Sequence, residues 1–246
     1  MNFFDEIKNR VVNNIQTDII YYGPSTTSFE NIFPNWGEII RYVLKAELED
    51  NIEDINKLWN LHTLNLGLDG ATSGDLLDRF QELVLDKKPY LIFLSAGKND
   101  VRFGVNSRTT IENIKELIQQ SLNNSIKVVF STYIPSLKSE ENIKMMEHIK
   151  NENKIAKSFI NNKNFVFVDL FALFPRDAIE KSYTLIEPEG NESLRLKPGD
   201  IDYVHYNKYG NAIVAKILLK EVFDINFDAD KFLEGLLDNN KKYPDY

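Results

Sequence analysis

The residues whose types and spacing best suit chemistry form the segment Asp202-Tyr203-Val204-His205 near the C-terminus. The chain contains 3 histidines in 246 residues, so few side chains could act as a base near neutral pH. An Asp three residues before a His can fold back in a tight turn and accept a hydrogen bond from the imidazole Nδ1–H, which orients the ring to take a proton from a serine. By itself the pattern is more typical of a surface turn. It predicts catalysis only if a serine and oxyanion donors lie beside it.

Alternating strands and helices are expected to supply the frame that brings such groups together. Short apolar and β-branched runs predict strands, and amphipathic segments between them predict helices. The alternation predicts a single α/β domain over residues 1–246, a flavodoxin-like three-layer sandwich around a five-stranded parallel sheet. The expected strands are 17–22, 62–66, 90–96, 127–134 and 165–170, and the expected helices are 3–15, within 35–49, 74–85, 109–122, within 140–162 and 210–223.

Two further expectations concern single segments. Thr109, three residues before Glu112, has the spacing of a capping box and is the expected N-cap of the helix at 109–122. Residues 176–200 lack periodicity and are rich in Pro and Gly, so we expect a long loop before Asp202. A structureless loop of this length is usually functional, and we expect it to form a wall or lid of a substrate pocket.

The expected strands carry polar residues at their carboxyl ends, where open parallel sheets bind ligands. The first strand runs into Gly23-Pro24-Ser25, the second into the segment from Asn65 to Gly70, and the third into Gly97-Lys98-Asn99-Asp100. Asp202 and His205 come from the last loop before the final helix. A serine, a glycine-rich turn and an asparagine are therefore expected at one edge of the sheet together with this pair.

These four segments resemble the sequence blocks of the SGNH hydrolases, the GDSL-type esterase family. The family has Gly-Asp-Ser after strand one, Asn-x-x-x-x-Gly after strand two, Gly-x-Asn-Asp after strand three and a C-terminal Asp-x-x-His. Here the blocks occur in family order over about residues 17–222; the third and fourth match fully and the second matches at Gly70. The first block differs, because Pro24 replaces the family's Asp, and proline fixes φ and removes a backbone donor at the turn.

Each residue of the four blocks has a chemical role and a structural alternative. Ser25, in a strand-to-helix turn, would present Oγ as nucleophile with its N–H near a helix N-terminus; the alternative is a helix cap at positions 25–27. Gly70 N–H and the Asn99 side-chain amide would complete an oxyanion hole with Ser25 N–H; the alternatives are a turn glycine and a loop-capping Asn. Asp100 is expected to brace its loop.

The reaction predicted from these roles is two-step acyl transfer, with His205 as base and Asp202 orienting it. By resemblance to the family the substrate is a small ester, and we favour a short acyl group such as acetyl on a carbohydrate or small metabolite. An acyltransferase would use the same residues. A non-catalytic flavodoxin-like module that binds a small molecule, or a family member that has lost activity, also stays open, the latter because of Pro24.

The composition limits the classes of partner that this chain is expected to bind. The net charge of −8 and pI near 5.1 argue against nucleic acid or an anionic membrane as the main partner. The chain has no Cys, and its remaining histidines, His62 and His148, show no metal-ligand spacing and are expected to be structural or solvated. No cofactor and no metal are expected. The first residues lack an apolar stretch, which predicts a cytoplasmic protein, and the oligomeric state is left open.

Overall fold

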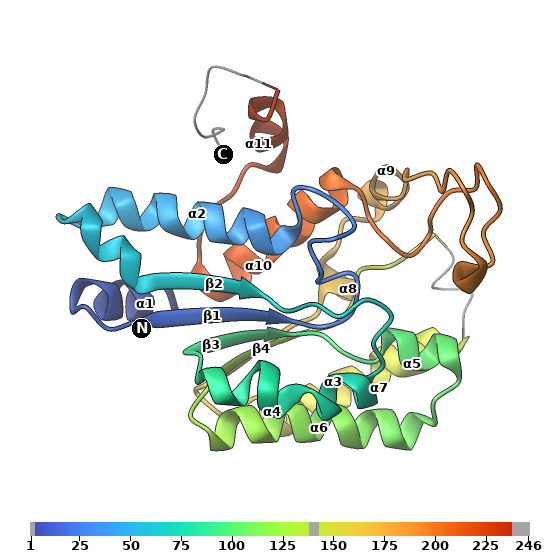
Figure 1. Cartoon of the computed structure of the whole chain (residues 1–246), viewed down its shortest axis with the longest axis horizontal. Helices are drawn as coiled ribbons and strands as arrows, with labels where there is room; N and C mark the ends of the chain where they lie inside the picture. Colours follow the sequence, from blue (N-terminus) through green and yellow to red (C-terminus); the bar gives the residue numbers. More distant parts are fainter. Residues whose placement is uncertain (1–2, 138–142, 238–246) are drawn as a thin grey trace.

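The computed structural model describes residues 3–137 and 143–237, and the centre of this part of the chain is a parallel sheet (Figure 1). Its five strands follow the order β2-β1-β3-β4-β5, and every neighbouring pair is parallel. The expected α/β class, strand number and flavodoxin-like order are confirmed. The strands are β1 (Thr17–Tyr22), β2 (Leu61–Asn65), β3 (Leu91–Leu94), β4 (Lys127–Ser131) and β5 (Phe165–Val168).

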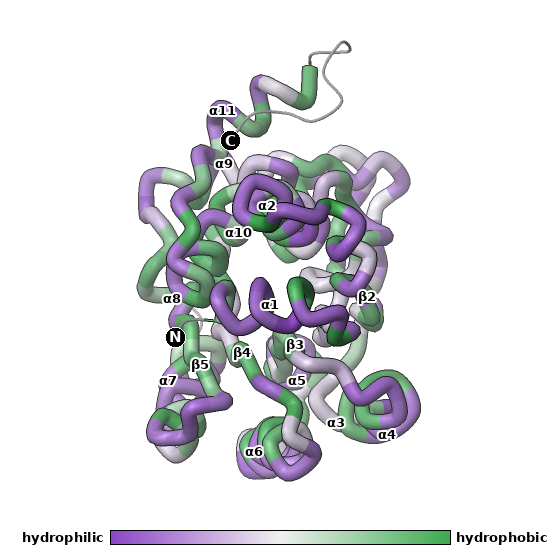
Figure 2. The backbone as a smooth tube through the Cα atoms, turned by 90° about the vertical axis from the view of Figure 1, so that its left-hand side faces the viewer, coloured by the Kyte–Doolittle hydropathy of each residue, from purple (hydrophilic) through white to green (hydrophobic). Residues whose placement is uncertain are grey.

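Helices cover both faces of the sheet (Figures 1 and 2). Side chains of a strand alternate between its faces, so Ile19 and Tyr21 belong to one buried cluster and Ile20 and Tyr22 to the other. Burial on both sides explains why the central strands are almost continuously apolar. One layer contains α1 (Phe3–Val12), α2 (Trp36–Asn51) and α10 (Lys208–Phe223), and the other contains α3 (Ser73–Asp78), α4 (Phe80–Leu83), α6 (Ser107–Asn123) and α7 (Ile143–Phe159).

Short elements connect and extend these layers. The N-terminal helix α1 buries Phe3, Ile7 and Val11 at helical spacing and lies towards the amino ends of the strands (Figure 1). The remaining elements are α5 (Lys98–Phe103), α8 (Leu170–Leu173), α9 (Ile179–Ser182), α11 (Ala229–Gly235) and the 3₁₀ turns η1 (Ile55–Asn60), η2 (Leu85–Lys87), η3 (Arg176–Ala178) and η4 (Glu192–Leu194).

Two expected helices differ from the structure. The helix expected at 74–85 is interrupted at Arg79, which separates α3 from α4, although Leu76 and Phe80 still face the core at helical spacing. The helix expected from Thr109 begins at Ser107, because the Asn106 side chain accepts the Arg108 N–H and so caps it. The Thr109 cap was therefore wrong, and Glu112 pairs with Arg108 instead of closing a capping box.

The segment at 176–200 is more ordered than the sequence indicated. It contains η3, α9 and η4, and it folds back on itself through antiparallel bridges between Ile186 and Ile201 and between Asn191 and Leu196. Tyr183 is buried, with its ring edge-on to Tyr206. The description of this segment as a structureless loop was therefore wrong, because buried contacts and bridges formed at long range leave no periodicity in the sequence.

A substitution in the turn after β3 tests how tightly the carboxyl edge of the sheet is packed. Gly97 has φ +102°, and a Cβ added there would lie 2.3 Å from His148 Cε1. We expect Gly97→Ala to lower the free energy of unfolding by about 2–4 kcal/mol, from left-handed strain and overpacking together. Gly104→Ala is the matched control, since Gly104 also has positive φ but open space around it. Urea unfolding should show Gly97→Ala as the more damaging change, and equal losses would contradict the packing argument.

Candidate active site

Ser25 lies at the point where the strand order changes direction. β1 has β2 on one side and β3 on the other, so the chain leaves β1 at the switch between the two halves of the sheet. Such switch points are where open α/β sheets form a crevice beyond the carboxyl ends of their strands. The loops after β2 and β3 start from the same edge, which places the second and third sequence blocks beside Ser25.

The turn that holds Ser25 is a single helical turn. The Pro24 carbonyl accepts the N–H groups of Thr27 at 2.8 Å and of Ser28 at 3.2 Å. Proline suits the first position of such a turn, since its missing N–H would have no partner there. The expected strand-to-helix turn was wrong in one respect: the next helix, α2, begins only at Trp36 and is capped by Asn35, so residues 25–27 cap no helix.

Asn65 and Gly67 hold this turn from the second block. The Asn65 amide donates to the Thr27 carbonyl at 2.7 Å, while its Oδ1 accepts the Gly67 N–H at 3.0 Å. A Cβ at Gly67 would lie 2.3 Å from the Ser28 nitrogen, so only glycine lets the two loops approach this closely. The sequence pattern indicates no role for Asn65 beyond its place in the second block. Only the structure shows that Asn65 braces the serine turn.

Ser25, His205 and Asp202 form one hydrogen-bonded chain. The Ser25 Oγ lies 2.8 Å from His205 Nε2, and His205 Nδ1 lies 2.6 Å from Asp202 Oδ2. The second carboxylate oxygen, Oδ1, accepts the N–H groups of Val204 at 2.7 Å and of His205 at 3.0 Å. The turn expected from the Asp-x-x-His spacing is thus present, and this is the geometry in which a His can remove a serine proton.

Asp202 is held in its ionised form. Burial by itself would raise the pKa of the Asp202 carboxyl, but the His205 ring and the backbone N–H groups of Val204 and His205 outweigh burial and bring the pKa below its ordinary value. The Asp202 side chain is 5% exposed and the His205 side chain 17%. The carboxylate is therefore available to stabilise an imidazolium on His205.

The segments that carry the expected oxyanion donors are joined by hydrogen bonds. Leu68 N–H donates to the Gly23 carbonyl at 2.8 Å, and the Asn99 side-chain amide donates to the Ala71 carbonyl at 3.0 Å. Gly70, with φ +73° and open space beside its Cα, lies between these two attachments. Within the described part of the chain, the N–H groups of Ser25 and Gly70 have no backbone acceptor. Asn99 keeps its second amide hydrogen for another partner.

Asp100 braces the third block, as expected, but residues 98–103 form the helix α5 and not the expected loop. It is buried and accepts hydrogen bonds from the Ser73 N–H at 2.7 Å, the Ser73 hydroxyl at 2.5 Å and the Thr110 hydroxyl at 2.9 Å. These bonds join α5 to the starts of α3 and α6, so the carboxylate fixes the position of α5, whose second residue is Asn99.

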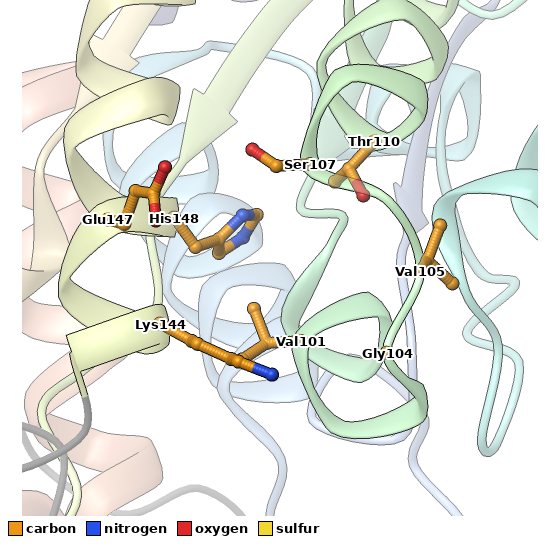
Figure 3. A pocket seen from close by; sticks show the side chains of 8 residues that line it. All are labelled: Val101, Gly104, Val105, Ser107, Thr110, Lys144, Glu147 and His148. Atoms are coloured by element: carbon orange, nitrogen blue, oxygen red, sulfur yellow. The ribbon is translucent and has the colours of Figure 1, made fainter.

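The two other histidines lie apart from the Ser25–His205 contact. His62 pairs with Asp18 at 3.0 Å on the edge of the sheet and is about half exposed. His148 is buried next to Glu152, 3.4 Å away, and borders a pocket of about 190 Å³ between α5, α6 and α7 (Figure 3). Burial tends to lower the pKa of His148, but the Glu152 carboxylate outweighs it and raises the pKa. Both rings therefore have structural partners, as expected.

The comparison with family models decides the assignment of the chain. The model of the GDSL-like Lipase/Acylhydrolase family matches residues 20–213, a range that includes Ser25 and His205. The chain belongs to this family. The resemblance stated from the four sequence blocks is confirmed, and membership places the chain among the ester hydrolases.

Similar proteins agree with this family at lower similarity. The uncharacterized lipoprotein YqeF of Bacillus subtilis (strain 168) is 32% identical over 124 residues, 48% of this chain and 49% of YqeF, so the match spans about half the length of that relative. A catalytic mutant of Axe2, an acetylxylan esterase from Geobacillus stearothermophilus, has a TM-score of 0.62 at 19% identity and covers 87% of this chain and 95% of its own. A GDSL-like lipase from Bacteroides thetaiotaomicron has a TM-score of 0.55 at 19% identity, covering 90% and 98%. These structures share the fold.

Pro24 stands where the family motif has Asp, and the structure shows that the turn forms with proline in that place.

No helix in the described ranges 3–137 and 143–237 is long and apolar enough to cross a membrane. The roles of Ser25, Gly70, Asn99, Asp202 and His205 in this family member stay predictions.

The lowered pKa of Asp202 predicts a pH-dependent stability. A carboxyl whose pKa falls on folding stabilises the fold above its ordinary pKa of 3.8 and loses that contribution as pH falls through the lower folded value. Wild type should therefore exceed Asp202→Asn in free energy of unfolding at neutral pH, and the difference should shrink below about pH 4. Denaturant unfolding from pH 3 to 7 measures this, with the exposed Asp50→Asn as control. A difference that stays constant over this range would show that the carboxylate is not stabilised by folding.

Proposed function

We propose that this chain is a serine esterase that cleaves a small ester through an acyl-enzyme intermediate. The observation that carries the proposal is the hydrogen-bonded chain from the Ser25 hydroxyl through the His205 ring to the Asp202 carboxylate. Three residues of suitable type, from opposite ends of the sequence, meet at hydrogen-bond distances at the switch point of the sheet. Family membership independently supports ester hydrolysis.

In the first step His205 Nε2 takes the proton of Ser25 Oγ as the oxygen attacks the ester carbonyl. Asp202 holds Nδ1–H and so leaves Nε2 free to accept, and its negative charge stabilises the imidazolium that forms. The carbonyl oxygen becomes an oxyanion, which we assign to the Ser25 N–H, the Gly70 N–H and the Asn99 side-chain amide. One such donor is typically worth about 3 kcal/mol of transition-state stabilisation.

In the second step the tetrahedral intermediate collapses and His205 gives its proton to the leaving alcohol. An acyl group then remains on Ser25 Oγ. Water attacks the acyl carbonyl as His205 removes its proton, and the same oxyanion donors act again. The bond between the acyl carbon and Ser25 Oγ then breaks, His205 returns the proton to Ser25 Oγ, and the acid is released. The three side chains return to their starting protonation states, so the cycle needs no cofactor. The predictions of no cofactor and no metal stay part of this proposal.

We favour a short acyl group, such as acetyl, on a carbohydrate or small metabolite. Exposed aromatic side chains follow Ser25 at Phe29 and Phe33, and Tyr203, within the turn from Asp202 to His205, is also exposed. Small-molecule sites typically combine aromatic side chains with a few convergent polar groups. Two structural relatives are described as acetylxylan esterases, which is consistent with this class. Transfer of the acyl group to a sugar would use the same residues, and the single-domain organisation and cytoplasmic location stay predictions.

Labelling of Ser25 tests the nucleophile directly. A fluorophosphonate probe should attach to Ser25 in wild type, as located by mass spectrometry, and hydrolysis of p-nitrophenyl acetate should accompany it. Ser25→Ala should lose labelling and reduce kcat by at least about 10³-fold, because no other hydroxyl contacts His205 Nε2 among the described residues.

Ser28→Ala is the matched control, since Ser28 is a buried serine of the same turn and its hydroxyl accepts the Glu30 N–H. It should keep labelling at Ser25. A Ser25→Ala variant that retains more than a few per cent of kcat would exclude Ser25 as the nucleophile. Labelling without turnover of any acetyl ester would instead point to a different acyl group.

The segment at 176–200 is proposed to form a wall of the substrate pocket beside Ser25 and to influence which ester alcohols that pocket accepts. It is hydrogen-bonded at two points to the turn from Asp202 to His205. The Asp202 N–H donates to the Leu185 carbonyl at 2.8 Å, and the Tyr203 hydroxyl donates to the Leu194 carbonyl at 3.0 Å. At this attachment the bridged pair Ile186 and Ile201 leaves apolar side chains exposed, at 64% and 50%.

Replacing this exposed pair should change selectivity without changing the chemistry. Ile186→Ser with Ile201→Ser is expected to alter kcat/KM unequally across acetyl esters of increasing alcohol size, by about 3-fold or more between the extremes. Ile160→Ser, at an equally exposed position beyond α7, is the control. Equal scaling of kcat/KM for every ester, with folding intact, would leave the segment without a role in selectivity.

A further inference from the structure

Lys98 connects the third and fourth sequence blocks. It is the first residue of α5, directly before Asn99, and its side chain crosses to the turn that carries Asp202 and His205. There its Nζ donates a hydrogen bond to the Val204 carbonyl at 3.2 Å, 106 positions away in the sequence. No other side chain in the described ranges donates a hydrogen bond to the backbone between Asp202 and His205.

The turn is therefore held from two sides. Asp202 Oδ1 accepts the N–H groups of Val204 and His205 from inside the turn, and Lys98 donates to the Val204 carbonyl from outside. The carbonyl of Val204 belongs to the peptide bond whose nitrogen is that of His205. A contact at this carbonyl fixes the peptide plane from which the imidazole extends, so it restrains the direction in which His205 Nε2 points.

Lys98 also brings a positive charge to this turn. Burial lowers the pKa of Lys98 to about 8, with the attraction of Asp202 opposing the shift and the nearby Arg102 adding to it. The ammonium is still mostly charged at neutral pH. Its Nζ also lies 5.5 Å from the centre of the Tyr133 ring, whose face favours a cation. The charged groups that face Lys98 are thus Asp202 and Arg102.

We propose that Lys98 is a positioning residue for the reaction: its ammonium holds the Val204 carbonyl so that the His205 ring stays aligned with the Ser25 hydroxyl. The inference rests on the proposed function, because it assigns a role to Lys98 within that site.

Three substitutions of Lys98 distinguish the effect of its charge from the effect of its hydrogen bond to the Val204 carbonyl. Lys98→Met removes both, Lys98→Gln removes the charge and keeps a donor, and Lys98→Arg keeps both. Lys115→Met removes an exposed lysine of α6 and is the control. We expect Lys98→Met to lower kcat for p-nitrophenyl acetate by 10-fold or more with KM within 2-fold, and Lys98→Arg to recover most of the loss. Lys115→Met should behave as wild type.

The split between kcat and KM, with rescue by arginine, is the readout that a purely structural role would not give. A misaligned His205 ring slows proton transfer and leaves substrate binding unchanged, so the loss should appear in kcat. Lys98→Gln, which keeps a donor, should lose less than Lys98→Met. A kcat of Lys98→Met within 2-fold of wild type, or a Lys98→Arg variant that recovers none of the loss, would overturn the proposal.

The rate at which the fluorophosphonate probe labels Ser25 keeps this test independent of ester turnover. Lys98→Met should be labelled about 10-fold or more slowly than wild type, and Lys115→Met at the wild-type rate. If wild type is not labelled at Ser25 and hydrolyses no ester, the proposed function fails. If Lys98→Met is labelled as fast as wild type, the role of Lys98 fails, whatever the ester activity.

Discussion

The site depends on one hydrogen bond, 2.8 Å long, between the Ser25 hydroxyl and the His205 ring, which lie 180 positions apart in the sequence. Neither residue belongs to a regular element: Ser25 lies in a single turn after β1, and His205 in a turn before α10. The bond can form only if both turns are held at the same edge of the sheet. Asn65 holds the serine turn from the last position of β2, while the Leu185 carbonyl and Lys98 hold the histidine turn from neighbouring segments.

Close packing at the carboxyl edge makes these attachments rigid. A Cβ at Gly23 would lie 2.5 Å from the Thr27 hydroxyl, and one at Gly67 would lie 2.3 Å from the Ser28 nitrogen. Glycine at these two places lets the strand end, the serine turn and the next loop approach at backbone distance. The Trp36 indole then donates to the Thr26 carbonyl at 2.9 Å, so the start of α2 also supports the serine turn.

Charge is distributed around the site so that each ionised group has a defined partner. Asp100 accepts hydrogen bonds from Ser73 and Thr110 and organises the helices around Asn99. Asp202 accepts bonds at both oxygens, which stabilises its ionised form despite burial. Lys98 places a positive charge at the Val204 carbonyl of the same turn. In surroundings with little water such charges interact more strongly than at the surface.

The sequence by itself determined the fold class and the residues of the four blocks, because strand patterns are local and the blocks occur at strand ends in family order. It also determined the Asp202–His205 turn, whose contacts span three residues. Only the tertiary structure decided how Ser25 is presented. The run Ser25-Thr26-Thr27-Ser28 has the composition of a helix cap, but its carbonyls are taken by Asn65, Trp36 and Asn35, and α2 starts later. The order within 176–200 and the reach of Lys98 to Val204 were likewise undetermined, since both depend on contacts between distant residues that leave no local pattern.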